Sequence, residues 1–362
     1  MKPIDVYLER ARELARRGVG STAPNPPVGA VIVRDGCTLG EGFHRERGAP
    51  HAEVEAISDA RSHGHDVRGA TMVVTLEPCD HHGATPPCTD AVLEAGFSRV
   101  VVGAADPNPK TAGAGIARLR RAGVEVVVAD DLPSRALIEP FAVWIRSTRP
   151  YVTLKMAASL DGYVAPEPGS HWLTGPESRE RVRELRVQHD AVMVGAGTIR
   201  VDDPQLTVRP PHARRKPYVR IVGCEDAPVP VASRVFESSP GYARTIVLAP
   251  ADARAQFETL EDVADCRYIE GARLDLPEAL RRLKDGGISS VLCEGGPTLA
   301  SALLAGGLVD RVIWILAPVF LASDRAVPAL ARGHDGLGAW TFEFAERVGE
   351  DLWLTAKPGT HV

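Results

Sequence analysis

The sequence predicts an α/β protein made of two consecutive domains, and three observations carry this prediction. Short runs rich in Val and Ile alternate with amphipathic segments along most of the chain, which is typical of strands and helices in a layered fold. The chain has 362 residues, a length that favours two domains over one. A helical pattern over 134–147 ends at Arg149-Pro150, and a β-rich segment follows directly. We therefore expect domains at 1–147 and 148–362.

The first domain is expected to begin with a helix and to continue as strands that alternate with helices. Ile4, Leu8 and Ala11 fall on one face of the first helix, over 4–17, so this face should pack on a sheet. The Asp35-Gly36 pair predicts a hairpin turn after a strand that begins near Val28. The further elements expected are helices over 51–61, 88–96, 115–122 and 134–147 and strands over 70–76, 99–103 and 124–128. This order predicts an α/β/α sandwich.

The second domain continues the alternation with a larger set of strands. Its first strand is expected over 151–156, and a helix over 177–186. Further strands are predicted over 191–195, 218–222, 245–248, 290–293 and 311–316, with a closing hairpin over 340–346 and 352–355. Prolines cluster between these segments, as they should if the segments pair within a sheet.

Composition narrows the classes of partner. The net charge is −5 and no run of basic residues occurs, so nucleic acid is not the expected main partner. No apolar run is long enough to span a membrane, and the N-terminus enters an amphipathic helix without a signal-peptide core. Six cysteines in a chain of this length do not form a dense disulfide framework, so we expect a reducing, cytoplasmic location.

Three residues of the first half, His51, Cys79 and Cys88, predict a zinc site, with Glu53 as the catalytic base beside it. Two thiolates and one imidazole suit Zn²⁺, and a set of three protein ligands leaves one position for water. Zinc lowers the pKa of such a water towards neutrality. Glu53 need not bind the metal, because from its place next to the ligands it could pass a proton from the water to a departing amine. This is the chemistry of a zinc-dependent deaminase.

A plainer interpretation stays open, in which His51 caps a helix and the cysteines are small core residues. The context weighs against it, because a strand ends just before Cys79 and a helix N-terminus at Cys88 favours thiolate. Eight residues separate the cysteines, where the common nucleobase deaminase pattern has two, and this longer loop could line a substrate pocket. Asn25 is a turn residue or a substrate contact, and His44 is a candidate substrate contact.

Two glycine-bearing turns make the second half a candidate nucleotide site. Gly295-Gly296 follows a predicted strand and opens a helix, and Gly195-Ala196-Gly197 is a second such loop. Backbone N–H groups at a helix start bind anions. Neither turn is a G-x-G-x-x-G fingerprint, so a Rossmann fold is not indicated, and a plain tight turn is the alternative for each. The charges that could bind a phosphorylated substrate, or else form solvated ion pairs, are those of Lys155, Arg186, Asp202 and Arg209.

Taken together, the motifs resemble those of the bifunctional riboflavin-biosynthesis deaminase/reductase family over nearly the whole chain. The motifs of the first half are Pro24-Asn25-Pro26-x-Val28-Gly29, Gly42-Phe43-His44, His51-Ala52-Glu53 and Thr75-Leu76-Glu77-Pro78-Cys79. Those of the second half are Lys155, Ser159-Leu160-Asp161-Gly162, Trp172-x-Thr174-Gly175-Pro176, Asp202-Asp203-Pro204-x-Leu206-Thr207-Val208-Arg209 and Glu294-Gly295-Gly296-Pro297. Family members often carry a basic residue where Ala84 stands, so this chain lacks one possible phosphate contact.

The resemblance implies a cytidine-deaminase-like α/β/α first domain and a dihydrofolate-reductase-like α/β second domain. With one Zn²⁺ per chain, the first would deaminate 2,5-diamino-6-ribosylamino-4(3H)-pyrimidinone 5′-phosphate. With NADPH, the second would reduce the ribosyl part to give 5-amino-6-ribitylaminouracil 5′-phosphate. The NADPH contacts implied are Ala157, Trp172, Thr198, Asp202, Gly296, Pro297, Thr298, Leu299, Ala300, Ser301 and Ala302. The substrate contacts implied are Ser170, Arg186, Leu206, Arg209, Glu294 and Lys155, with Arg186 and Arg209 as phosphate clamps.

Other classes compete with this interpretation. A nucleobase or nucleoside deaminase with a non-catalytic or differently specific second domain would explain the first half only. A stand-alone pteridine-type reductase would explain the second half only. A non-catalytic zinc-binding scaffold would not need Glu53. We expect an enzyme with a phosphorylated pyrimidine as substrate, assembled as a homo-oligomer, either dimer or tetramer.

Overall fold

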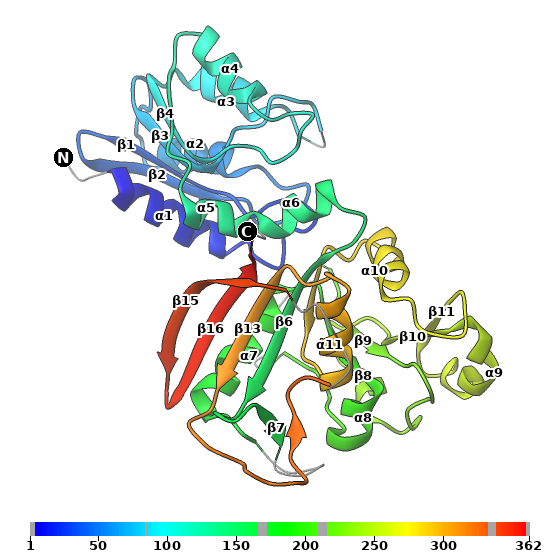
Figure 1. Cartoon of the computed structure of the whole chain (residues 1–362). Coiled ribbons are helices and arrows are strands. Elements are labelled where there is room, and N and C mark those ends of the chain that lie inside the picture. Colours follow the sequence, from blue (N-terminus) through cyan, green and yellow to red (C-terminus); the bar gives the residue numbers. More distant parts are fainter. Residues whose placement is uncertain (1–3, 84, 166–171, 209–215, 332–337, 360–362) are drawn as a thin grey trace. The chain divides into compact units, whose positions relative to one another are not determined.

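The computed structural model describes residues 4–83, 85–165, 172–208, 216–331 and 338–359. The chain divides into two compact units, Met1–Ser147 and Thr148–Val362 (Figure 1). Both units are α/β, which confirms the fold class expected from the sequence. Within the described residues, no helix combines the length and the apolar character needed to cross a membrane.

The first unit is built on a five-stranded sheet with the order β2-β1-β3-β4-β5. β1 runs antiparallel to β2 and to β3, whereas β3, β4 and β5 are parallel. Asp35 and Gly36 close the β1–β2 hairpin with positive φ angles of 49° and 81°, as a tight two-residue hairpin turn requires. The strands are β1 (Gly29–Arg34), β2 (Cys37–Phe43), β3 (Thr71–Leu76), β4 (Arg99–Ala104) and β5 (Glu125–Val128).

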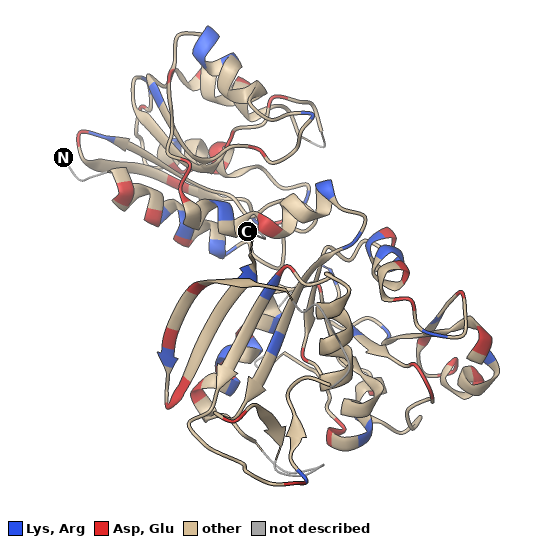
Figure 2. Ribbon diagram, viewed as in Figure 1, with Lys and Arg blue, Asp and Glu red and all other residues tan. Residues whose placement is uncertain are grey.

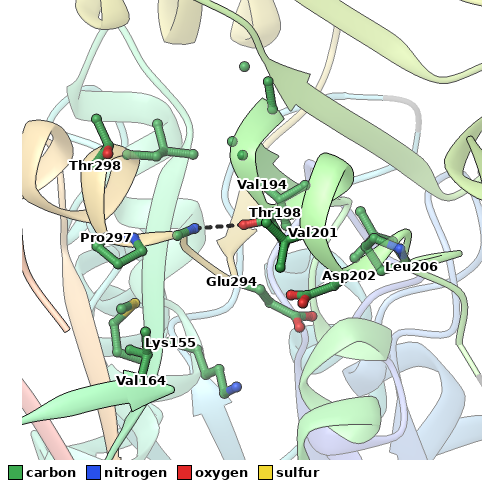
Figure 3. Close-up of a pocket in the computed structure, with 18 of the residues that line it drawn as sticks. Lys155, Val164, Val194, Thr198, Val201, Asp202, Leu206, Glu294, Pro297 and Thr298 are labelled. Carbon is green, nitrogen blue, oxygen red and sulfur yellow. Dashed lines mark hydrogen bonds between the residues drawn. The ribbon is translucent and has the colours of Figure 1, made fainter. Parts of the chain in front are cut away.

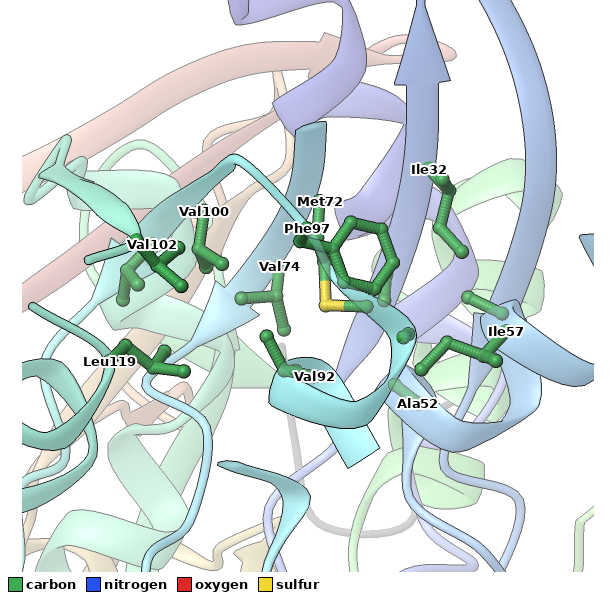
Figure 4. Packing of buried hydrophobic residues seen from close by; sticks show 14 of the residues in the cluster. Ile32, Ala52, Ile57, Met72, Val74, Val92, Phe97, Val100, Val102 and Leu119 are labelled. Carbon is green, nitrogen blue, oxygen red and sulfur yellow. The ribbon is translucent and has the colours of Figure 1, made fainter. Parts of the chain in front are cut away.

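Helices cover both faces of this sheet, because successive strand residues point to opposite sides. In β1, Ile32 packs in the cluster that contains Ile57 of α2 and Val92 of α3 (Figure 4). Val31 of the same strand packs instead with Leu8 of α1. The predicted α/β/α sandwich therefore forms. The helices are α1 (Ile4–Arg16), α2 (Ala52–Ser62), α3 (Cys88–Ala95), α4 (Ala114–Arg121), α5 (Leu132–Leu137) and α6 (Glu139–Arg146).

The prediction of a single helix over 134–147 is wrong, because the structure has two helices, α5 and α6, that meet at Ile138. Pro140 lies in the first turn of α6, has no backbone N–H to donate to the preceding turn and so ends the first helix. Ile138 is 4% exposed and joins the core of the unit, which fixes the break.

The second unit is built on a nine-stranded sheet with the order β11-β10-β9-β8-β12-β6-β13-β16-β15. Its strands are parallel from β11 to β13, and the final hairpin adds β16 and β15 antiparallel. The strands are β6 (Tyr151–Ala158), β8 (Ala191–Gly195), β9 (Val219–Gly223), β10 (Ile246–Pro250), β11 (Asp265–Ile269), β12 (Ser290–Cys293), β13 (Arg311–Leu316), β15 (Trp340–Val348) and β16 (Asp351–Pro358). A separate two-stranded ribbon pairs β7 (Tyr163–Ala165) with β14 (Val327–Pro328).

Helices lie on both faces of the nine-stranded sheet. Leu280 of α10 and Leu303 of α11 pack in one core cluster, and Ile199 of α8 and Phe257 of α9 pack in another. The α-helices are α7 (Pro176–Gln188), α8 (Ala196–Asp202), α9 (Arg254–Phe257), α10 (Leu276–Asp285) and α11 (Pro297–Ala305), and the 3₁₀ turns are η1 (Arg234–Phe236), η2 (Ala251–Ala253) and η3 (Glu258–Leu260). The connections β8–α8 and β12–α11 therefore leave the carboxyl ends of adjacent parallel strands, where ligands usually bind in such sheets.

Candidate active sites

The three predicted zinc ligands meet in the first unit. His51 precedes α2, Cys79 follows β3 and Cys88 is the first residue of α3. The Nδ1 atom of His51 lies 3.1 Å from Sγ of Cys88 and 3.6 Å from Sγ of Cys79. All three possible ligand atoms lie within 4.8 Å of one another. The second nitrogen of His51, Nε2, lies 3.4 Å from the Thr85 hydroxyl and has a partner outside the cluster.

This geometry fits a zinc ion. Tetrahedral zinc with Zn–S near 2.3 Å and Zn–N near 2.0–2.1 Å places neighbouring ligand atoms about 3.6 Å apart. The observed separations of 3.1 and 3.6 Å are close to that value. Hydrogen bonding with Cys88 and with His51 lowers the pKa of the Cys79 thiol, which favours the thiolate that metal binding needs.

Glu53 lies in the first turn of α2 and is 3% exposed. Burial raises the pKa of its carboxyl to about 7, near the range suited to a general acid and base. The position of α2 depends on Gly42 of β2, since a Cβ there would come 2.3 Å from the Ala56 nitrogen. This close approach of strand and helix brings Glu53 to the ligand cluster.

His44 lies beside the ligand cluster, and Asn25 contacts His44. The rings of His44 and His51 are 5.0 Å apart between centroids. Burial lowers the pKa of His44, which favours the neutral imidazole. Its Nδ1 lies 3.1 Å from the Pro50 carbonyl oxygen and donates to it, which leaves Nε2 to accept from the Asn25 amide nitrogen at 3.3 Å. The carbonyl oxygen of Asn25 is therefore the end of the amide turned away from His44.

The second unit holds a large pocket of about 1330 Å³ at the carboxyl ends of its parallel strands (Figure 3). Single ligands usually occupy cavities of roughly 300–1,000 Å³, so this one has room for a dinucleotide and a substrate together. The predicted contacts that line it are Lys155, Ala157, Trp172, Arg186, Thr198, Asp202, Leu206, Glu294, Gly296, Pro297, Thr298, Leu299 and Ala302. Ala300 and Ser301 belong to the same helix start but are fully buried and do not line the pocket.

The two glycine turns meet in this pocket. The backbone N–H of Gly195 donates to the Gly295 carbonyl oxygen at 3.0 Å. The N–H of Gly296 donates to the Thr198 hydroxyl at 3.0 Å, across the gap between the two helix starts. The two tight turns are therefore one structure rather than two separate loops, and they present the N-terminus of α11 to the pocket.

Two charged side chains of the pocket, Lys155 of β6 and Glu294 after β12, come from adjacent strands (Figure 3). Burial lowers the pKa of the Lys155 amine. Burial of Glu294 opposes ionisation, but the guanidinium of Arg186 holds the pKa of this carboxyl below its usual value.

The structure gives Arg186 a partner that the sequence did not predict. Its Nε and Nη2 atoms donate to the two oxygens of Glu294 at 2.5 and 2.9 Å, and Nη1 donates to the Thr207 carbonyl oxygen at 2.9 Å. The ion-paired alternative for Arg186 therefore describes this structure, and its role as a phosphate clamp stays a prediction. The other expected clamp, Arg209, and the expected contact Ser170 lie outside the described residues, as does Ala84.

Some pocket residues gave no signal in the sequence. Val164 and Ala165 of β7 and Val327 of β14 form a wall of the pocket through the small ribbon. These residues are short and apolar, and more than 160 positions separate the two strands, so only the folded chain brings them together.

The fold and the sites define a two-part enzyme that joins a zinc-dependent deaminase to a reductase. The family model described as "Cytidine and deoxycytidylate deaminase zinc-binding region" matches residues 1–104, and "RibD C-terminal domain" matches residues 150–354. The chain therefore belongs to the family of bifunctional riboflavin-biosynthesis deaminase/reductases.

Individual relatives agree over nearly their whole length. The chain is 40% identical to "Riboflavin biosynthesis protein RibD" of Escherichia coli, covering 97% of this chain and 98% of that protein. It is 39% identical to the protein of the same name from Aquifex aeolicus, covering 97% of both. The solved structure of Acinetobacter baumannii RibD, at 35% identity, superposes with a TM-score of 0.82 over 98% of both chains. That of the Thermotoga maritima deaminase/reductase has a TM-score of 0.81, at 35% identity and 98% coverage of both chains.

Proposed function

We propose that this chain carries out two consecutive reactions on one phosphorylated pyrimidine. Residues 1–147 deaminate 2,5-diamino-6-ribosylamino-4(3H)-pyrimidinone 5′-phosphate, and residues 148–362 reduce the product with NADPH to 5-amino-6-ribitylaminouracil 5′-phosphate. The observation that carries the proposal is the cluster of His51, Cys79 and Cys88 beside the buried Glu53.

In the deaminase site, His51, Cys79 and Cys88 hold the zinc ion, which supplies an activated water when bound. Glu53 takes a proton from the attacking water and delivers it to the 2-amino group, which leaves as ammonia. Asn25 meets the pyrimidine edge with the amide end that His44 leaves free. A purine or cytosine deaminase needs the same proton transfer, so the edge contacts rather than Glu53 set the choice of base.

In the reductase site, the N-terminus of α11 and Thr198 bind the cofactor phosphates, since backbone N–H groups at a helix start favour anions. When bound there, NADPH would supply the hydride for reduction at C1′ of the ribosyl group. Opening of the sugar ring also requires a proton at the ring oxygen. Lys155 lines the pocket on the strand next to the one that Glu294 follows and donates this proton, and the burial that lowers the pKa of its amine makes it a stronger acid. Glu294, fixed by Arg186, orients the sugar hydroxyls.

Product analysis tests the proposal. Incubating the full chain with the diamino substrate in the absence of NADPH should yield ammonia and a product in which oxygen replaces the 2-amino nitrogen. Adding NADPH should convert that product to one with two further hydrogens. A product that keeps the 2-amino group under both conditions would overturn the deaminase assignment. Deamination without any NADPH oxidation would favour a second unit of another specificity.

Two further expectations stay predictions. A homo-oligomer, dimer or tetramer, would appear in sedimentation as a species of two or four chains. A cytoplasmic location would appear as recovery with the cytosolic fraction of the source cell.

A further inference from the structure

Outside the ligand cluster, one arginine of α4 joins the segments that carry the two thiols. Arg118 donates through Nη1 to Asp80 at 2.7 Å and to the Thr89 hydroxyl at 3.0 Å, and through Nη2 to Asp90 at 2.5 Å. Asp80 directly follows Cys79, whereas Thr89 and Asp90 directly follow Cys88. A single guanidinium therefore bridges the two ends of the loop between the cysteines.

The two ends of this loop also bond to each other. The Thr89 hydroxyl donates to Asp80 at 2.7 Å, and the Thr89 N–H donates to the Cys79 carbonyl oxygen at 3.2 Å. The N–H of Cys88 donates to Sγ of Cys79 at 3.3 Å. Thr89 is fully buried, so its two hydrogen bonds are shielded from solvent.

Helix α4 is itself held against the segment that carries Cys79. The Glu77 carboxylate accepts from the backbone N–H groups of Gly113 at 3.0 Å and Ile116 at 3.2 Å, at the start of α4. A Cβ at Gly115 would come 2.0 Å from the Pro78 carbonyl oxygen, so the helix backbone rests directly on the chain next to Cys79. α4 thus contacts this segment on both sides of Cys79, at Glu77 and at Asp80.

We propose that α4 sets the separation of the two metal-binding thiols and that Arg118 is a positioning residue of the zinc centre. The inference rests on the proposed ligand roles of Cys79 and Cys88. The loop between the cysteines holds eight residues, so its own length does not fix where its ends lie. Loss of groups that orient metal ligands typically costs 10–100-fold in metal affinity. The ion pairs of Arg118 are partly exposed, so their effect on overall stability is small.

The test measures zinc affinity of the full chain by competition with a chromophoric chelator. Arg118→Ala should weaken zinc binding by about 10–100-fold. Arg121→Ala is the matched control from the same helix. The Arg121 charge also acts on Asp80, but within the described residues its side chain donates a hydrogen bond to the Ala117 carbonyl oxygen of α4 and none to the segments that carry the thiols. This variant should bind zinc as the unchanged chain does. Figure 2 shows the basic residues at one end of α4, and the last turn of this helix contains Arg118, Arg120 and Arg121.

Two more arms separate the possible failures. Asp80→Asn removes the charge that Arg118 contacts and keeps the shape of the side chain, so it should also weaken zinc binding. It provides the test if Arg118→Ala does not fold. The absorption bands of the Co²⁺-substituted protein, which report thiolate geometry, should shift in Arg118→Ala and not in Arg121→Ala. If folded Arg118→Ala and Asp80→Asn keep the zinc affinity and the Co²⁺ spectra of the unchanged chain while Cys79→Ser loses zinc, the role of Arg118 is overturned and the ligand assignment stands. Zinc fully retained by Cys79→Ser would overturn the ligand assignment.

Discussion

The buried ion pair of Arg186 and Glu294 allows one prediction to be worked out in magnitude. The side chains of the pair are only 17% and 10% exposed, and three hydrogen bonds hold the guanidinium. Arg186→Ala would leave the Glu294 carboxylate buried without its bidentate partner. Removing one member of a buried pair costs about 3–5 kcal/mol when an uncompensated charge stays behind. Lys155 still offsets part of the Glu294 charge, so we expect a loss at the lower end of this range in the free energy of unfolding of the second unit.

Arg181→Ala provides the matched control on the same helix, α7. Arg181 pairs with Glu346, but these side chains are 37% and 47% exposed, and exposed pairs contribute about 0–1 kcal/mol. Its guanidinium also lies 4.8 Å from the centroid of the Trp353 ring, and such a contact at a partly exposed site contributes about 0.5–1 kcal/mol. The assay is urea unfolding followed by tryptophan fluorescence, which reports mainly on the second unit because four of the five tryptophans lie in Thr148–Val362. A cost for Arg186→Ala no larger than that for Arg181→Ala would refute the reasoning.

Three further predictions concern the metal, the cofactor and pH. The double variant Cys79→Ser, Cys88→Ser should lose the zinc that metal analysis finds at about one equivalent in the unchanged chain, and full retention would contradict the ligand assignment. A fragment that begins at Thr148 should bind NADPH in a fluorescence titration; a folded fragment that does not bind would assign the site to the whole chain. Hydrogen bonds from the Ser159 hydroxyl and from the backbone N–H groups of Leu321 and Ala322 lower the pKa of Asp161 to about 2 from 3.8. The stabilisation that this carboxylate contributes is therefore full above the unfolded pKa and is lost as pH falls through the folded pKa. The melting-temperature difference between the unchanged chain and Asp161→Asn should therefore shrink between about pH 5 and about pH 3, and a constant difference would contradict this account.

The parts of the fold that the sequence predicts are those set by local pattern. Alternation of Val31 and Ile32 in β1 is enough to place helices on both faces of the first sheet. Residue chemistry also predicts the zinc cluster, because His and Cys together have few other common uses at such spacing. Pro140 was present in the sequence as a helix-ending signal, but the apolar spacing around it imitates one continuous helix.

The parts that the sequence does not predict depend on contacts between distant residues. Arg186 and Glu294 are 108 positions apart, and Arg118 and Asp80 are 38 positions apart. Neither arginine differs in type or local pattern from the other arginines of its helix. Only the folded backbone decides which guanidinium meets a carboxylate, and so which charges are left for a substrate.

The substitution Glu53→Gln tests the central claim, that one chain holds two separate catalytic sites. It keeps the size of the side chain and removes the proton-transferring carboxylate, so ammonia release from the diamino substrate should fall about 10²–10⁴-fold. Zinc content should stay unchanged, because Glu53 is not one of the three ligands. Oxidation of NADPH with the already deaminated substrate should proceed at the rate of the unchanged chain. If the folded, zinc-loaded variant lost both reactions, a single composite site would replace the two sites described.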